Sequence, residues 1–322
     1  MELTFLGTSA GAPTADRNVS GLALRVDGHW DLFDCGEGTQ HRLLQTPLSL
    51  PKLRRVFVSH LHGDHCFGLF GVLGSRSMDR SPTELSIFGP PGLRNMIDVV
   101  LDASSTYLTY PIEVHEIGAE GGRVIDDDDM TVDALPLTHR VMSFAWSMHE
   151  RDRPGRFDVE AARAAGVPDG PLFGQLQRGD EVELADGRRV DPADLSGPPR
   201  RGRRIVVAGD NSAPVELLDR TDGADVLVHE ATYTEPVLAT LDEDYGHSTA
   251  ARVAIAAQDS GVRNLILTHF SPRFGPSGSS AALTIDDVGA EARQHFDGGL
   301  HLANDLDRIA ISHDGTSIEA VT

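Results

Sequence analysis

The sequence of 322 residues has little cysteine, almost no lysine and no long hydrophobic run. Its two cysteines, Cys35 and Cys66, are too few for the disulfide framework of a small secreted domain, so we expect a reducing, cytoplasmic location. No apolar stretch approaches the roughly 18 residues that a membrane-spanning helix needs, and the first residues lack the basic start of a signal peptide. We therefore expect no membrane span.

Positive charge is also scarce in this chain. It has 28 Lys and Arg residues, of which only Lys52 is a lysine, against 49 Asp and Glu residues, and its formal net charge is −21. A chain of this charge repels polyanions, so the net charge alone argues against a nucleic-acid partner. With 40% hydrophobic and 24% charged residues, the composition is otherwise that of a globular protein that can bury a large core.

Short β-rich runs alternate with helical patterns, which predicts a layered α/β protein. The expected strands span residues 3–6, 22–26, 30–33, 55–59, 85–88, 112–117, 130–135, 204–207, 225–229 and 264–268, and the expected helices 66–77, 93–104, 215–220, 248–259 and 286–295. From about Arg151 to Arg204 the chain is instead rich in glycine, proline and charge. A loop of that length is uncommon inside a compact domain and is usually functional, although a variable surface insertion has the same composition. We expect one domain over residues 1–322 with an insertion at 151–204.

The most informative motif is SHLHGDH at residues 59–65, directly after a hydrophobic strand. Imidazole and carboxylate ligands together suit zinc, or another borderline divalent ion such as manganese. The motif has too many ligands for one tetrahedral ion that keeps an open position. It therefore predicts two ions that share a site, with His60 and His62 on one and Asp64 and His65 on the other.

A dinuclear site needs further ligands, and three polar residues that follow later apolar runs are candidates: His139, Asp210 and His269. Each comes at the end of an expected strand, so all three can reach the same edge of a sheet. Asp210 has two carboxylate oxygens and is the natural bridge between the ions. We expect Cys66, next to the histidine loop, to be a small core residue and not a ligand.

These ligands and several segments around them carry a family resemblance. The HxHxDH motif with a separate His, Asp and His at strand ends resembles the metallo-β-lactamase fold, an αββα sandwich with a dinuclear metal site. The resemblance is closer to one branch, the short-form ribonuclease Z, the tRNA 3′-processing endonuclease. The similar segments are FLGTSAGAPTADRNVSGL, LFDCGEGTQHRLL, VSHLHGDHCFGL, GPPGL, VLVHEAT, GHST and LILTHFSPRF. They run from residue 3 to about 274, most of the chain.

The resemblance implies catalytic roles for three residues. Asp64 would orient or deprotonate the attacking water while it ligates metal. Glu230 and His247, from HEAT and GHST, resemble the family's pair that protonates the leaving 3′-oxygen, with His247 as the donor and Glu230 as its support. Taken without the resemblance, His247 would be interpreted only as a neighbour of a helix N-cap.

The resemblance also implies contacts with precursor tRNA. Arg273 would hold a phosphate, and Thr232 and Ser248 would offer hydroxyls to the acceptor end. The insertion resembles the protruding, flexible arm of bacterial ribonuclease Z, an exosite that clamps the tRNA elbow. The family relationship implies a homodimer in which the arm acts in trans. Residues 150–204 hold 11 basic and 11 acidic residues, so the whole net charge of −21 lies outside the arm.

The sequence departs from the family pattern at Phe70, at Asn211 and in the segment VMSFAWSM after His139. Two other functions stay open: a metallo-hydrolase of small phosphodiesters or sulfate esters, and an RNA-binding protein with a vestigial site. The insertion favours the nuclease, because a small ester needs no clamp of that length.

Overall fold

A computed structural model of the chain describes residues 1–321 apart from 80, 154, 156, 198, 199, 222 and 244. The contacts divide the chain into two compact units. The first comprises Met1–His149 and Arg204–Thr322, and the second comprises Glu150–Arg203. Among the described residues, no helix has the length and apolar character needed to cross a membrane.

Two large sheets form the centre of the first unit. The strands of one sheet are β1 (Glu2–Gly7), β2 (Gly21–Val26), β3 (His29–Cys35), β4 (Leu53–Phe57), β5 (Leu85–Gly89), β6 (Ile112–Glu116), β16 (Arg308–Ile311) and β17 (Ile318–Ala320), in the order β17-β16-β1-β2-β3-β4-β5-β6. The strands of the other are β7 (Gly122–Asp126), β8 (Met130–Leu137), β9 (Ser143–Glu150), β12 (Arg204–Ala208), β13 (Val226–Glu230), β14 (Asn264–Thr268) and β15 (Gly299–Leu302), in the order β15-β14-β13-β12-β9-β8-β7.

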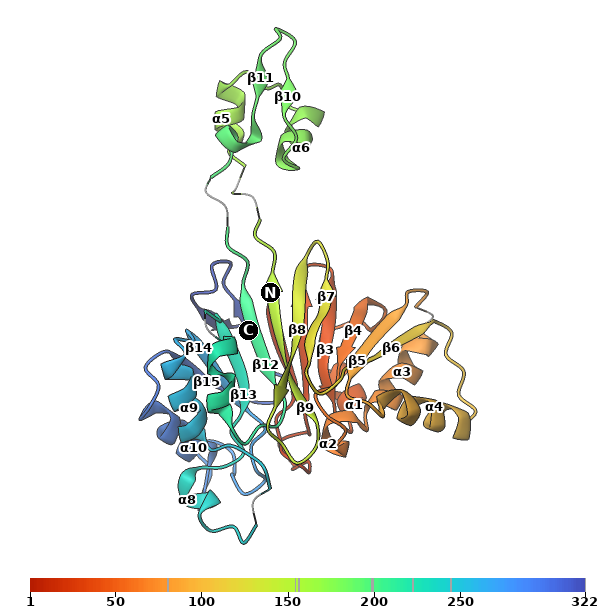
Figure 1. Ribbon diagram of the computed structural model, residues 1–322, viewed down its shortest axis with the longest axis vertical. Helices are drawn as coiled ribbons and strands as arrows, with labels where there is room; N and C mark the ends of the chain where they lie inside the picture. The colour runs from red at the N-terminus through yellow and green to blue at the C-terminus, as the bar shows by residue number, and fades with distance from the viewer. Residues whose placement is uncertain are drawn as a thin grey trace. The chain divides into compact units, whose positions relative to one another are not determined.

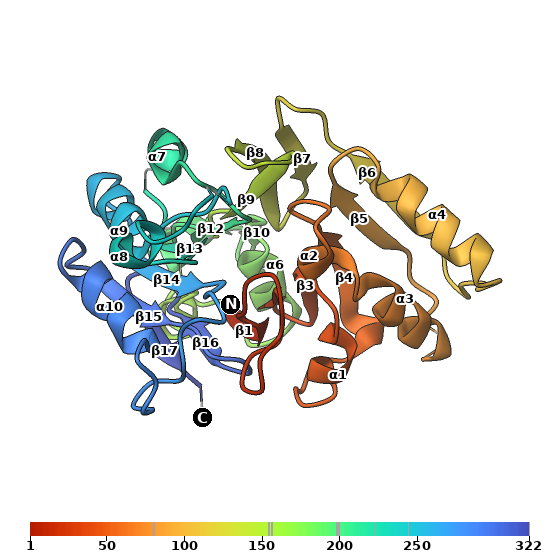
Figure 2. The same cartoon turned by 90° about the horizontal axis from the view of Figure 1, so that it is seen from below.

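Helices cover the outer faces of both sheets. The helices of the first half are α1 (Thr39–Leu43), α2 (Gly63–Cys66), α3 (Leu69–Met78) and α4 (Leu93–Ala103). Those of the second half are α7 (Leu218–Thr221), α8 (Glu235–Leu238), α9 (Ala250–Asp259) and α10 (Ile285–Arg293). Figures 1 and 2 show α3 and α4 outside one sheet and α9 and α10 outside the other, so the first unit has four layers in the order αββα.

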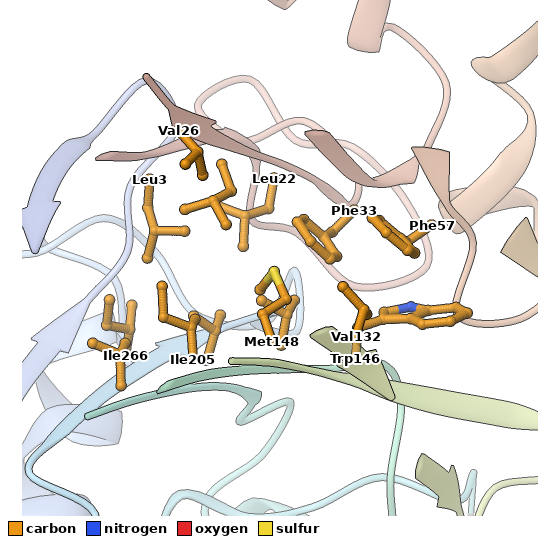
Figure 3. Close-up of a cluster of buried hydrophobic side chains, with 14 of the residues drawn as sticks. Leu3, Leu22, Val26, Phe33, Phe57, Val132, Trp146, Met148, Ile205 and Ile266 are labelled. Carbon is orange, nitrogen blue, oxygen red and sulfur yellow. The ribbon is translucent and has the colours of Figure 1, made fainter. Parts of the chain in front are cut away.

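The main core lies between the two sheets. Strand side chains alternate between that core and the helical layers, because each sheet is covered on both faces. Phe57 belongs to the core between the sheets, whereas its neighbours Val56 and Val58 pack in the layer of α3 and α4. Figure 3 shows Phe57 facing Trp146 of the opposite sheet, and their ring centroids are 5.1 Å apart. The histidine-rich loop therefore follows a strand that is anchored on both faces.

The ten strands predicted from the sequence are all present, with small shifts at their ends. Strands β7, β9, β15, β16 and β17 were not predicted. The helix predicted at residues 66–77 is present as α3 and begins three residues later than predicted, because a break separates it from the short helix α2. The break falls at Gly68, whose main chain approaches Gly36 so closely that a Cβ atom would lie 2.0 Å from the Gly36 carbonyl oxygen.

The second unit has helices, a short hairpin and a core of its own. Its elements are α5 (Val159–Ala164), α6 (Pro171–Gln177), β10 (Val182–Glu183), β11 (Arg189–Val190) and η2 (Pro192–Leu195). Its core consists of seven buried side chains: Ala162, Val167, Leu176, Val182, Leu184, Val190 and Leu195. The glycine- and proline-rich composition did not indicate this much regular structure.

The basic segment at residues 198–204 is less basic at its surface than its sequence suggests. Pro198 and Pro199 lie outside the described residues. Arg203 is 5% exposed, and its Nε and Nη2 donate to Oε2 and Oε1 of Glu150 at 2.7 and 2.9 Å. This buried ion pair neutralises one of the arginines.

Candidate metal centre and proton-donor pair

The seven predicted metal ligands lie in two adjoining clusters in the first unit. In the first cluster, four side chains each offer a ligand atom within 4.8 Å of the others: His60, His62, His139 and Asp210. Three side chains form the second by the same measure: Asp64, His65 and His269. The loop after β4 and the short helix α2 supply His60, His62, Asp64 and His65, while the ends of later strands supply the rest.

Asp210 lies between the two clusters, because its two oxygens face different histidines. Its Oδ2 lies 3.6 Å from Nε2 of His60, and its Oδ1 lies 3.3 Å from Nε2 of His65 and 3.4 Å from Nε2 of His269. Asp210 is 2% exposed, and within the described part of the chain its Oδ1 has no hydrogen-bond partner. A buried carboxylate oxygen without a hydrogen-bond partner destabilises the folded protein unless a cation faces it. The surroundings of Asp210 therefore fit a bound metal.

Main-chain and carboxylate acceptors fix the ring orientation of two of these histidines. Nδ1 of His65 lies 2.7 Å from Oδ2 of Asp34, and Nδ1 of His139 lies 2.8 Å from the carbonyl oxygen of Gly246. A carboxylate or carbonyl oxygen only accepts, so in both rings the proton sits on Nδ1. Nε2 of each ring then faces the cluster, where it offers a lone pair to a metal once it carries no proton of its own.

Hydroxyl groups hold two other histidines in the same way. Nδ1 of His60 lies 3.0 Å from Oγ of Ser59, and Nδ1 of His269 lies 3.0 Å from Oγ1 of Thr232. Each hydroxyl donates its own proton to a buried carboxylate, so it accepts from the imidazole. Imidazoles with Nδ1 held from outside and Nε2 aimed inward are the usual form of metal-ligating histidine. The donor set therefore fits a divalent metal.

Burial and the charges of neighbouring residues shift the pKa values of several predicted ligands. Burial lowers the pKa of His60 well below its ordinary value, which keeps this imidazole neutral. Burial alone would lower the pKa of His65 as well, but the carboxylates of Asp210 and Asp34 outweigh it and raise that pKa well above its ordinary value. The charges of His269 and His65 hold the pKa of Asp210 well below normal in spite of burial.

Asp34 is a functional residue that sequence reasoning missed. Besides holding His65, its Oδ1 accepts the main-chain N–H of Ser59 at 2.7 Å. Asp34 adopts a left-handed conformation with φ of 53°, as does the ligand His269 with φ of 56°, and such conformations in non-glycine residues concentrate at functional sites. One sequence feature could have indicated Asp34: it is a carboxylate directly after the hydrophobic run 30–33, within the segment LFDCGEGTQHRLL that resembles the family.

Glu230 and His247 form a pair beside the metal clusters. Nδ1 of His247 lies 3.1 Å from Oε1 of Glu230, which is 1% exposed. The same Oε1 accepts the main-chain N–H of Asn211 at 2.9 Å. Burial alone would lower the pKa of His247, but the Glu230 carboxylate, with a smaller contribution from Asp210, raises it to about 9. His247 can therefore carry a proton at neutral pH.

The residues predicted to touch RNA lie in different surroundings. Arg273 is exposed and lines a cleft over the clusters. Thr232 and Ser248 are 2% and 0% exposed. The hydroxyl of Thr232 contacts His269 and Glu230, while that of Ser248 donates to the carbonyl of Asn211. Burial and these hydrogen bonds favour a positioning role for both hydroxyls over a direct RNA contact.

The cleft has a volume of about 330 Å³ and contains several residues that were not predicted. Its lining is Ala10, Gly11, His62, Asp64, His139, Arg140, Asp210, Thr232, Tyr233, Tyr245, His247, Ser271, Pro272 and Arg273. The N-terminal loop reaches the cleft because the main-chain N–H of Gly11 donates to Oδ2 of Asp64 at 2.8 Å. Arg140 and Tyr245 are exposed at the cleft, so a phosphate and an aromatic base both have partners there.

The structure gives the contacts of three further residues that were noted in the sequence: Cys66, Phe70 and Asn211. The thiol of Cys66 donates to the carbonyl of His62, and burial raises its pKa to about 12, so it stays protonated at neutral pH. Phe70 packs in the layer of α3 and α4. The side-chain amide of Asn211 lies 3.1 Å from Nε2 of the buried His229.

Comparison with known proteins bears on the fold and the family. A family model described as anti-Pycsar protein Apyc1 matches residues 1–110. Ribonuclease Z of Brevibacillus brevis is 46% identical over 319 residues, and the alignment covers 98% of each chain. The crystal structure of human tRNase Z, short form, has a TM-score of 0.69 at 29% identity and covers 97% of this chain and 100% of that one.

A further solved structure bears on the fold alone. The metallo-β-lactamase fold protein YhfI from Bacillus subtilis has a TM-score of 0.63 at 19% identity and covers 95% of this chain and 98% of that one. Together with the layer order, this likeness confirms the αββα metallo-β-lactamase fold expected from the sequence.

Proposed function

The chain belongs to the ribonuclease Z family, and we propose from that premise that it is a metal-dependent endoribonuclease that acts on precursor tRNA. It removes the 3′ trailer by hydrolysis of one phosphodiester bond and leaves a 3′-hydroxyl on the tRNA. The observation that carries this function is the pair of ligand clusters that meet at Asp210, in a chain 46% identical to a ribonuclease Z over almost its full length.

Two divalent ions would occupy the clusters, zinc in the first place, with manganese as the alternative. His60, His62 and His139 would hold one ion, Asp64, His65 and His269 the other, and Asp210 would bridge them. Support comes from the two oxygens of Asp210, which face separate groups of histidines. When bound, two such ions polarise the phosphodiester and lower the pKa of the attacking water.

The protein side chains supply orientation and proton transfer. Asp64 lines the cleft and is held by the N–H of Gly11, so its carboxylate can orient the attacking water or accept its proton. Its neighbours His269 and His65 outweigh burial and keep the pKa of Asp64 far below neutral, so it is ionised. His247 holds a proton at neutral pH and can donate it to the leaving 3′-oxygen, while Glu230 stabilises its charged form.

RNA binding would depend on a few local contacts, because the net charge of the whole chain, −21, repels RNA. Arg273 and Arg140 are exposed at the cleft and would hold phosphates beside the scissile bond. The unit Glu150–Arg203 would bind the body of the tRNA, in trans within a homodimer. Its charge supports this role, because residues 150–204 hold equal numbers of acidic and basic residues while the remainder carries the full −21. A cytoplasmic location remains the prediction for such an enzyme.

The experiment that tests this function compares two substrates for the metal-loaded protein. One is a precursor tRNA with a 3′ trailer, and the other is bis(p-nitrophenyl) phosphate. We expect one defined cut near the discriminator base of the tRNA together with hydrolysis of the small ester. Hydrolysis of the small ester with an uncut tRNA would refute the tRNA function and favour a hydrolase of small phosphodiesters or sulfate esters.

A further inference from the structure

We propose that Gly246 is a positioning residue of the metal centre, which holds His139 through its main-chain carbonyl and leaves only tight space for a side chain. The inference rests on the proposed metal-dependent function and adds a residue to it. Gly246 is buried and lies between Tyr245, which lines the cleft, and His247, the proposed proton donor.

The carbonyl of Gly246 sets the orientation of the His139 ring. It accepts from Nδ1 of His139 at 2.8 Å, so the lone pair of Nε2 is left for the cluster. That Nε2 lies 3.4 Å from Nδ1 of His62 and 3.9 Å from Oδ2 of Asp210. A displaced carbonyl would free the imidazole to rotate or to take the other tautomer, and either change removes a ligand atom from the first cluster.

This support differs in kind from that of three other histidines in the clusters. His60, His65 and His269 are held through Nδ1 by side chains, namely those of Ser59, Asp34 and Thr232. His139 is held by a main-chain oxygen, so its support depends on the local backbone conformation. The conformation at Gly246 is left-handed, with φ of 77°, a region that suits glycine and strains other residues.

The space around Gly246 explains why this position requires glycine. A Cβ atom there would lie 3.2 Å from Nδ1 of His139 and 3.1 Å from Cγ of Arg140. Both contacts are tighter than ordinary Cβ contacts, and the His139 ring has little freedom to retreat because its side chain is fully buried. A methyl group would therefore push directly on a metal ligand.

The same turn connects the metal ligand to the proton donor. The ring centroids of His139 and His247 are 5.4 Å apart, and the residue that holds the first is the chain neighbour of the second. A shift of the turn at Gly246 therefore moves His247 relative to Glu230 as well as His139 relative to Asp210. One small residue thus aligns two parts of the site.

The test compares Gly246→Ala with Gly261→Ala. Gly261 has nearly the same left-handed φ of 68°, but nothing lies within 4 Å of the added Cβ atom, so this control carries the backbone strain without the contact with His139. Zinc affinity is measured by competition with a chromophoric chelator. We expect Gly246→Ala to lose about 10- to 100-fold in affinity, and Gly261→Ala to stay within about twofold of the unaltered protein. Equal affinities for the two variants would overturn the proposal.

A second measurement uses the unaltered, metal-free protein, so it tests the proposal even if the variant Gly246→Ala does not fold. Nitrogen-15 NMR of the histidine rings reports which nitrogen carries the proton, and the spectrum of His139→Gln assigns the His139 signal. We expect the proton on Nδ1, and a proton on Nε2 would overturn the proposal. Neither measurement involves RNA. Failure of the unaltered protein to cut precursor tRNA would therefore refute the proposed function and leave the role of Gly246 to be decided by the affinities.

Discussion

Oε1 of Glu230 accepts two hydrogen bonds at once, from Nδ1 of His247 at 3.1 Å and from the main-chain N–H of Asn211 at 2.9 Å. The second bond ties Glu230 to the residue after Asp210, so the pair of Glu230 and His247 shares one support with Asp210. This relationship sets the distance between proton donor and metal clusters through the backbone. Asn211 makes this bond with its main-chain N–H, so the bond does not depend on the type of side chain at this position.

The pH dependence of cleavage should follow the charge of His247. Its pKa is raised to about 9 in the folded protein, so the proton is present below that pH and activity falls as the pH rises through it. In Glu230→Gln the stabilising carboxylate is gone, and the alkaline limb of the rate profile should move to lower pH. His247→Ala should lose about 10²- to 10⁴-fold in kcat.

The pH dependence is measured as single-turnover rates of cleavage of precursor tRNA. A range of about four pH units, from about pH 6 to about pH 10, includes the expected pKa of His247. Glu84→Gln, an exposed glutamate elsewhere, is the control and should leave the profile unchanged. An alkaline limb that stays in place in Glu230→Gln would contradict the assignment of His247 as proton donor.

Asp210→Asn should remove metal and activity together. The amide keeps the shape of the side chain, but it cannot present two anionic oxygens to the two clusters. Metal analysis after gel filtration gives the measurement, and we expect the bound metal to fall to a small fraction of that in the unaltered protein. Asp225→Asn is a matched control, because Asp225 is also fully buried but pairs with Arg263 before β13 begins.

The control variant should lose stability and keep its metal. Retention of full metal and activity by Asp210→Asn would contradict the role of Asp210 as bridging ligand.

Removal of the unit Glu150–Arg203 should separate tRNA cleavage from small-ester hydrolysis. His149 and Arg204 are paired across strands β9 and β12, so an Asn-Gly turn can join them and close a two-residue hairpin. We expect the shortened protein to hydrolyse bis(p-nitrophenyl) phosphate at nearly the original rate and to lose most cleavage of precursor tRNA. Equal loss of both activities would mean that the unit serves the fold and not RNA binding.

The ion pair of Glu150 and Arg203 should make the second unit sensitive to acid. Burial alone would raise the pKa of Glu150, but the hydrogen bonds and charge of Arg203 outweigh it and lower that pKa. Because the folded-state pKa is depressed, the stabilisation is present above the ordinary glutamate value of 4.5 and is lost as the pH falls through the folded-state pKa. Glu150→Gln removes the carboxylate charge that faces the buried Arg203 and should cost about 3–5 kcal/mol.

Hydrogen exchange of amides within residues 150–203 reports this loss. Asp186→Asn removes an exposed partner of Arg188 in the same unit and should change the exchange little. Similar exchange in the two variants would show that the buried pair adds nothing to the stability of this unit.

The sequence indicated which side chains cluster because the pattern of four of them is local. His60, His62, Asp64 and His65 occur within six residues after a strand, and a loop of that length must bring them together. Their supports were harder to find, since Asp34 and Gly246 are distant in sequence and act only through contacts that the fold creates. Gly246 acts through its main-chain oxygen, and the type of a residue does not indicate whether its main-chain oxygen makes such a contact.

Burial accounts for the other differences between expectation and structure. Thr232 and Ser248 were predicted to offer hydroxyls to RNA, yet both side chains are buried, and their hydroxyls bond to Glu230, His269 and Asn211. Strand β17 is at the edge of its sheet and β16 is next to it. Both are short and only partly buried, so they lack the hydrophobic pattern from which central strands such as β4 and β13 were predicted.

The chemistry of the cut ends tests the central claim most directly. The metal-loaded protein is incubated with precursor tRNA, and the termini of both products are identified by enzymatic end-labelling and mass spectrometry. Hydrolysis by an activated water, with His247 protonating the leaving oxygen, predicts a 3′-hydroxyl on the tRNA and a 5′-phosphate on the trailer, from a single cut. A 2′,3′-cyclic phosphate on the tRNA, or an intact precursor, would contradict the account.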